Sequence, residues 1–185
     1  RLLVMKYVSA AESYPGVVDV ASGKLTLFPV DGGKASFGGF AFAPDGKAVY
    51  FISDEPLQGK PQEFKTLRFH DPDSGKFEVL TSDIPWDVGG LNIADDGKHL
   101  AFVSNEDGIS KLRVLSLPDH REIRLPALPI GVIGGLAFSP DGRTLYFLSG
   151  KSGSSQLYAI PATGGTPRQI TDVPVDVGGF QIAPD

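Results

Sequence analysis

The sequence predicts an all-β fold, a β-propeller of four-stranded antiparallel blades that carries four blades' worth of strands in permuted order. The first observation is a phrase that recurs about every 45 residues, a period typical of propeller blades. It reads GGFAFAPDGKAVYFIS at Gly38–Ser53, GGLNIADDGKHLAFVS at Gly89–Ser104 and GGLAFSPDGRTLYFLS at Gly134–Ser149, and a shortened copy, GGFQIAPD, begins at Gly178.

The second observation is a run in each copy that is apolar at consecutive positions. These runs are Ala48–Ile52, Leu100–Val103 and Leu145–Leu148. A strand covered on one face alternates between apolar and polar residues, whereas a continuous apolar run is typical of a strand buried on both faces. Blades packed between two neighbours bury their central strands in this way.

Each full unit is expected to hold four strands, and the unit that begins at Gly38 shows them in order. The first strand ends at a Pro-Asp-Gly turn, in which proline presets φ, aspartate caps and glycine takes positive φ. The remaining three strands follow, with a polar loop before the third and an Asp-Ser-Gly turn before the fourth; the four segments are Gly38–Ala43, Val49–Ile52, Lys65–His70 and Lys76–Leu80.

The two ends of the chain predict the permuted order. Leu2–Val8 is typical of a second strand without its own first strand, and Gly178–Ala183 is typical of a first strand without its second. Pairing of the last strand with the first blade would close a ring, as many propellers do to remove open edges. The number of blades in the assembled ring stays open: four, a larger parent ring, or two copies. The expected units are 1–37, 38–88, 89–133 and 134–177, with a closing strand at 178–185.

Composition excludes several classes of function. The 185 residues carry 17 basic and 22 acidic side chains, a net charge of −5, which argues against nucleic acid or an anionic membrane as partner. There is no cysteine, so disulfides, thiol catalysis and cysteine-ligated zinc are excluded. None of the three histidines has a recurring partner at metal-ligand spacing. The sequence therefore predicts neither a metal nor a cofactor.

The pattern [SA]-P-D-G-[KR]-x-[LV]-x-F-x-S resembles the TolB-like, WD-repeat-like propeller repeat. Ile84–Leu117 and Leu125–Ser149 carry the likeness best. They resemble the propeller of the prolyl oligopeptidase family of serine peptidases, which includes the acylaminoacyl-peptidase and dipeptidyl-peptidase types. The resemblance implies a non-catalytic propeller that scaffolds an α/β-hydrolase domain and restricts access to its catalytic residues.

The sequence contains no candidate nucleophile. An α/β-hydrolase elbow needs G-x-S-x-G between a strand and a helix. The nearest candidate, Gly150–Ser154, lacks the final glycine and lies in a polar loop. No catalytic residue is predicted, and this chain is not expected to be an enzyme by itself. The expected partners are a hydrolase domain of the parent chain, a second copy of this chain, or a peptide.

Five residues are candidates for binding on the side of the longer loops. Antiparallel strands place the Pro-Asp-Gly and Ser-Gly turns on one side and the longer, more acidic loops on the other, where contacts usually lie. Asp87 and Asp176 occupy matching places just before first strands and could bind a cationic group, or could only cap the turn. Trp86 beside Asp87 is a candidate for stacking or, alternatively, for packing between blades. Glu55 and Glu106 match after second strands, where a solvated loop also explains them.

Two other readings of the function stay open. The chain could be a TolB-like interaction module whose acidic loop side binds a protein. Alternatively, because it starts at Arg1 rather than methionine and holds about four units, it could be an excised or engineered set of blades with only a structural role. Sequence beyond residue 185 would separate these readings from the peptidase one.

Overall fold

The computed structural model describes all residues except 29, 31–32, 129, 151–152 and 184–185. The described residues form strands and no α-helix, and among them no helix is long and apolar enough to cross a membrane. The strands are β1 (Leu2–Ser9), β2 (Glu12–Val18), β3 (Leu25–Leu27), β4 (Phe37–Phe42), β5 (Val49–Ser53), β6 (Thr66–Asp71), β7 (Lys76–Val79), β8 (Val88–Ile93), β9 (His99–Glu106), β10 (Ile109–Ser116), β11 (Glu122–Ile123), β12 (Ile133–Phe138), β13 (Thr144–Ser149), β14 (Gln156–Pro161) and β15 (Arg168–Gln169).

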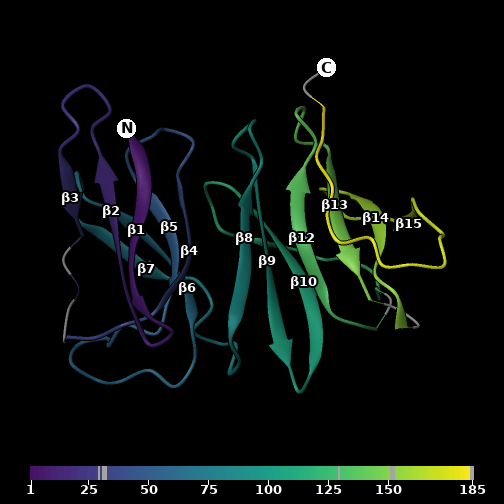
Figure 1. Cartoon of the computed structure of the whole chain (residues 1–185), viewed down its shortest axis with the longest axis horizontal. Coiled ribbons are helices and arrows are strands. Elements are labelled where there is room, and N and C mark those ends of the chain that lie inside the picture. Colours follow the sequence, from purple (N-terminus) through teal and green to yellow (C-terminus); the bar gives the residue numbers. More distant parts are fainter. Residues whose placement is uncertain (29, 31–32, 129, 151–152, 184–185) are drawn as a thin grey trace. The chain divides into compact units, whose positions relative to one another are not determined.

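These strands form four antiparallel sheets, which confirms the all-β prediction (Figure 1). One sheet is three-stranded, β1-β2-β3, and three are four-stranded, β4-β5-β6-β7, β8-β9-β10-β11 and β12-β13-β14-β15. The chain divides into two compact units, residues 1–89 and 90–185. The boundary falls inside β8, and each unit is described by itself below.

Unit 1 contains the sheets β1–β3 and β4–β7. The first of them begins with the equivalent of a second strand, as the sequence predicted from Leu2–Val8. The Pro-Asp-Gly turn before β5 has the expected chemistry: Asp45 Oδ1 accepts a hydrogen bond from Lys47 N at 2.9 Å, and Gly46 has a φ of 68°. All five residues of β5 are buried, so the expected burial of both faces holds here.

Unit 2 packs the sheet β8–β11 against β12–β15. Its core is a cluster of aliphatic and aromatic side chains from β9, β10, β12, β13 and β14. In β13, however, burial alternates: Leu145 and Phe147 are fully buried, whereas Tyr146 and Leu148 are only half-buried. On the half-buried side of β13, the Phe180 ring lies 6.2 Å from the Tyr146 ring.

Of the two glycines that open each repeat phrase, the second adopts in two of the copies a backbone conformation that other residues rarely adopt. The second glycine of two pairs, Gly90 and Gly135, has φ of 68° and 59°, a region that side-chain-bearing residues rarely adopt. The register of β12 against β13 shifts between Gly134 and Ala137, which is a β-bulge. A Cβ on Gly135 would lie 3.1 Å from the Leu148 side chain. Glycine is therefore favoured at position 135 by the bulge, by the positive φ and by the nearby Leu148 side chain.

The expected closing strand is not formed among the described residues. Residues 178–183 make no strand pairing, and 184–185 lie outside the described residues. A strand needs a hydrogen-bonded neighbour, and residues 178–183 have none among the described residues. The segment nonetheless packs on the sheet before it, because Phe180 contacts β13 through Tyr146.

Candidate functional site

A cavity of about 1230 Å³ in unit 1 is lined by residues of both of its sheets. Strand register builds one wall, because two cross-strand rows of side chains face it. One row is Phe40, Phe51, Arg68 and Val79, and the other is Phe42, Val49, His70 and Phe77. We call this space the phenylalanine cavity.

The opposite wall comes from the three-stranded sheet and the segment that follows it. Pro15 of β2 lines it together with Phe28 and Val30. Residues 55–62 form a further side of the cavity, where Leu57 and Lys60 exchange two backbone hydrogen bonds of 3.0 Å around a tight turn. The turn residues Gln58 and Gly59 both have positive φ, so this part of the loop has a defined conformation.

Arg68 and Glu55 are the buried ion pair of this cavity. Arg68 is fully buried, and its Nη1 lies 3.5 Å from Glu55 Oε2. Its Nη2 donates to the Glu55 carbonyl oxygen at 2.7 Å, and its Nε donates to Thr66 Oγ1 at 3.0 Å. Burial lowers the pKa of the Arg68 guanidinium, and the negative charges of Glu55 and Asp54 oppose that shift. Glu55 is 8% exposed, so its interpretation as a solvated loop residue is wrong.

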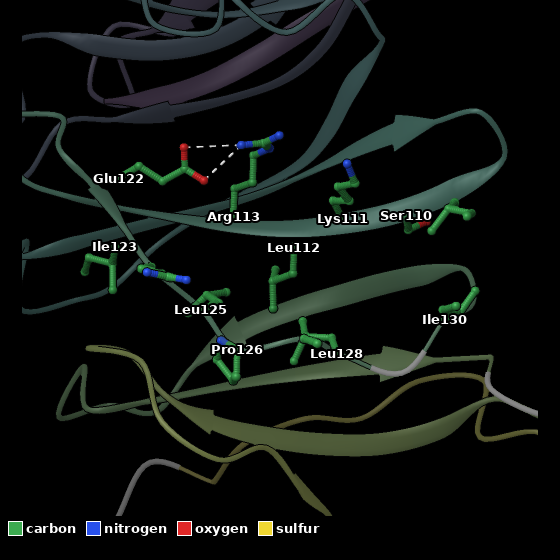
Figure 2. Close-up of a pocket in the computed structure, with 13 residues that line it drawn as sticks. Ser110, Lys111, Leu112, Arg113, Glu122, Ile123, Leu125, Pro126, Leu128 and Ile130 are labelled. Carbon is green, nitrogen blue, oxygen red and sulfur yellow. Dashed lines mark hydrogen bonds and ion pairs between the residues drawn. The ribbon is translucent and has the colours of Figure 1, made fainter.

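The same arrangement recurs in unit 2. Ser104 and Glu106 repeat the spacing of Ser53 and Glu55, and Arg113 pairs with Phe102 as Arg68 pairs with Phe51. Arg113 Nη2 donates to Glu106 Oε1 at 2.8 Å, and its Nη1 donates to Glu122 Oε1 at 2.9 Å. Figure 2 shows Arg113 and Glu122 facing one another from the neighbouring strands β10 and β11.

The unit 2 pair lies at a smaller hollow. This hollow has a volume of about 370 Å³ and lies along β10, β11 and the segment from Arg124 to Leu128 (Figure 2). Leu125 and Leu128 pack against the core cluster that contains Leu112. Aliphatic side chains therefore line part of this hollow, and the charged side chains beside it pair with one another.

Glu106 is held as a carboxylate by its neighbours. Partial burial would raise its pKa, but hydrogen bonds from Lys111, Arg113 and Ser104 outweigh burial and lower the pKa to about 2. Ser104 Oγ donates to Glu106 Oε1 at 2.8 Å, and Lys111 is in direct contact with the other carboxylate oxygen. The side chain is therefore an anchor for two cations of its own unit.

Asp87 and Asp176 are fastened to backbone amides. Asp87 Oδ1 accepts from Lys65 N at 2.8 Å, and Asp176 Oδ1 accepts from Ser155 N at 2.6 Å. The next residue closes each link, because Val88 N donates to the Lys65 carbonyl and Val177 N donates to the Ser155 carbonyl. Each aspartate thus ties the start of one repeat copy to the third strand of the copy before it. Binding of a cationic group by these carboxylates stays a prediction.

Trp86 is half-buried and packs on an aromatic neighbour. Its ring centroid lies 6.4 Å from that of Phe64, with the planes tilted by 40°. Phe64 belongs to the loop before β6, so this contact lies beside the Asp87 link. Neither residue lines the phenylalanine cavity.

Sequence reasoning missed Arg68, the residue that connects the candidate Glu55 to the cavity. A signal was available: an arginine stands in the third strand of two units, opposite the phenylalanine of F-x-S, and the glutamate follows that serine by two residues. The structure does not bring the five predicted residues to one place. Glu55 lines the cavity, Asp87 and Trp86 lie elsewhere in unit 1, and Glu106 and Asp176 belong to unit 2.

No family model and no curated protein matches this sequence, but solved structures do. A prolyl endopeptidase superimposes with a TM-score of 0.68 at 20% identity, covering 94% of this chain and 25% of that one. TolB from Acinetobacter baumannii gives 0.64 at 20% identity, over 89% of this chain and 39% of TolB. A putative TolB from Agrobacterium tumefaciens gives 0.64 at 24%, over 90% and 57%.

The fold is a TolB-like β-propeller. Its blades resemble those of the prolyl oligopeptidase family, as the recurring phrase implied. At these identities the likeness concerns the fold alone. The propeller segment also spans less than two thirds of each of these three chains.

Proposed function

We propose that this chain is the non-catalytic propeller segment of a prolyl-oligopeptidase-like serine peptidase. There it scaffolds a hydrolase domain and restricts the substrates that reach it. The observation that carries the proposal is the superposition of 94% of the chain on a quarter of a prolyl endopeptidase. The repeat phrase, which resembles that family, supports it independently.

The local construction of the repeats suits a scaffold. Aspartates link successive repeat copies through backbone amides. In two copies an arginine of the third strand also pairs with a glutamate at or just after the end of the second strand. Such links hold loops on a rigid frame, which is where binding and gating contacts usually lie. The sequence carries no nucleophile elbow, so the catalytic serine is assigned to a separate domain.

Two samples test this proposal. The purified 185-residue chain should neither cleave prolyl peptides nor react with a serine-directed fluorophosphonate. The full product of the reading frame that contains this sequence should label at one serine outside these residues. Its variant without the propeller should cleave long substrates that the intact protein rejects. Stoichiometric labelling of the 185-residue chain itself would contradict the proposal.

A TolB-like interaction module is the second candidate. It is favoured by the two TolB chains, which superimpose on 89% and 90% of this chain, and by the net charge of −5. A reading frame without hydrolase sequence, together with salt-sensitive binding of a basic protein, would support this candidate over the peptidase segment.

A further inference from the structure

The phenylalanine cavity combines an apolar body with an excess of positive charge. Arg1, Lys47, Lys60 and Arg68 line it, against one carboxylate, Glu55, among the described lining residues. The protein as a whole has the opposite balance, with a net charge of −5. Positive charge gathered in a cavity favours an anionic ligand there.

The size and lining of the cavity point to an apolar body for that anion. Its volume of about 1230 Å³ exceeds the roughly 300–1,000 Å³ of most small-molecule sites. Phenylalanines of β4, β5 and β7, together with Phe28 after β3, supply the walls. Leaving such a surface against water is unfavourable, and an extended hydrocarbon would remove it from water.

Arg68 supplies a donor at the wall. Its guanidinium is fully buried, and two of its three nitrogens already donate, to Thr66 Oγ1 and to the Glu55 carbonyl. Among the described residues the third nitrogen, Nη1, has no hydrogen-bond partner, because its contact with Glu55 Oε2 at 3.5 Å is an ion pair without a hydrogen bond. A buried donor of this kind is costly to leave unmade, and guanidinium groups match carboxylates well.

We propose that the phenylalanine cavity binds an apolar monocarboxylate, with the hydrocarbon chain against the phenylalanines and the carboxylate on Arg68 Nη1. Nη1 is the one Arg68 nitrogen without an acceptor among the described residues, and it suits a single carboxylate oxygen. Glu55 is a like charge beside the bound carboxylate, so it limits affinity and favours singly charged ligands. This inference is independent of the peptidase proposal, because it requires no hydrolase domain.

Calorimetric titration with sodium dodecanoate, below its micelle-forming concentration, tests the site, with dodecanol as the uncharged comparison. The chain should bind one dodecanoate and prefer it to dodecanol by about tenfold. Glu55→Gln removes the like charge and should tighten dodecanoate binding severalfold. The double variant Glu55→Gln/Arg68→Met should lose most of the preference for dodecanoate over dodecanol. Val79→Trp, which fills the cavity wall, should abolish binding of both.

Glu106→Gln is the matched control, because it changes the equivalent glutamate of unit 2, away from the cavity. It should leave dodecanoate affinity unchanged. Absence of saturable binding, equal affinity for dodecanoate and dodecanol, or weaker binding in Glu55→Gln would each overturn the proposal. The last comparison keeps it falsifiable even where the double variant fails to fold.

Discussion

At the scale of single residues, the same ion pair has different surroundings in the two units. Arg68 is fully buried with Glu55, whereas Arg113 is one-fifth exposed and shares its charge between Glu106 and Glu122. A buried pair is weak support for stability, but removing one partner leaves an uncompensated charge. The two pairs should therefore respond very differently to substitution.

Arg68→Met should destabilise unit 1 by about 3–5 kcal/mol, because it leaves Glu55 buried without its cation. Glu55→Gln/Arg68→Met should recover much of that loss. Trp86 is the only tryptophan and lies in unit 1, so urea unfolding followed by its fluorescence reports on this unit. Arg113→Met is the control and should leave that transition unchanged. Equal losses for the single and double variants would refute the pairing.

Acid should remove the contribution of Glu106 to stability. Its pKa falls from 4.5 to about 2 in the folded chain. A group whose pKa is lower in the folded chain contributes stability at pH values above its unfolded pKa. That contribution is lost as the pH falls through the folded pKa. Glu106→Gln should therefore be less stable than the unmodified chain at about pH 7, with the gap closing between pH 4.5 and about 2. Denaturation followed by circular dichroism measures both chains, and a constant gap would contradict the prediction.

At the scale of elements, the repeat phrase specifies its own connections. An aspartate, Asp87 or Asp176, stands two residues before the paired glycines in two copies. Its carboxylate accepts a hydrogen bond from the backbone amide just before the preceding third strand. A threonine a few residues earlier repeats the principle: Thr81 Oγ1 accepts from Leu67 N and Thr171 Oγ1 accepts from Leu157 N, each at 2.9 Å. Side-chain oxygens thus accept hydrogen bonds from backbone amides that have no partner in a neighbouring strand.

Asp87→Ala should destabilise unit 1 by about 0.5–1.5 kcal/mol, the net range for a typical hydrogen bond, because this bond is exposed to solvent. Asp87→Asn keeps an acceptor oxygen and should lose less. The tryptophan-detected urea transition again measures unit 1, with Asp176→Ala, in unit 2, as the matched control. If Asp87→Ala leaves stability unchanged but weakens binding of a cationic peptide, the carboxylate serves binding rather than structure.

At the scale of the whole molecule, two segments lack a strand neighbour among the described residues. Strand β1 lies at the edge of its sheet, with no strand on its outer side among the described residues, and it exposes Leu2, Tyr7 and Val8. Residues 178–183 carry the first-strand phrase without a strand partner in the described chain. Exposed edges favour pairing with another strand. The predicted closure, within one chain or between two, would give both segments a strand partner.

Deletion of residues 178–185 should therefore promote association through the β1 edge. Light scattering coupled to size exclusion should give the full chain a discrete mass, either 19.6 kDa or twice that. The shortened chain should give larger, heterogeneous species. A mass distribution that does not change on deletion would rule out pairing of this segment with β1. A discrete dimer of the full chain would indicate that two copies complete one ring.

The sequence by itself determined the repeat, the strands and their turns, because period, apolar runs and Pro-Asp-Gly chemistry act over a few residues. It also predicted a strand at Leu2–Val8, where the structure has β1. Only the tertiary structure decided that Glu55 is buried beside Arg68, that Asp87 and Asp176 bind distant backbone amides, and that phenylalanines of several strands line one cavity. These features depend on strand register and on packing between sheets, which bring together residues far apart in the chain and leave no local pattern.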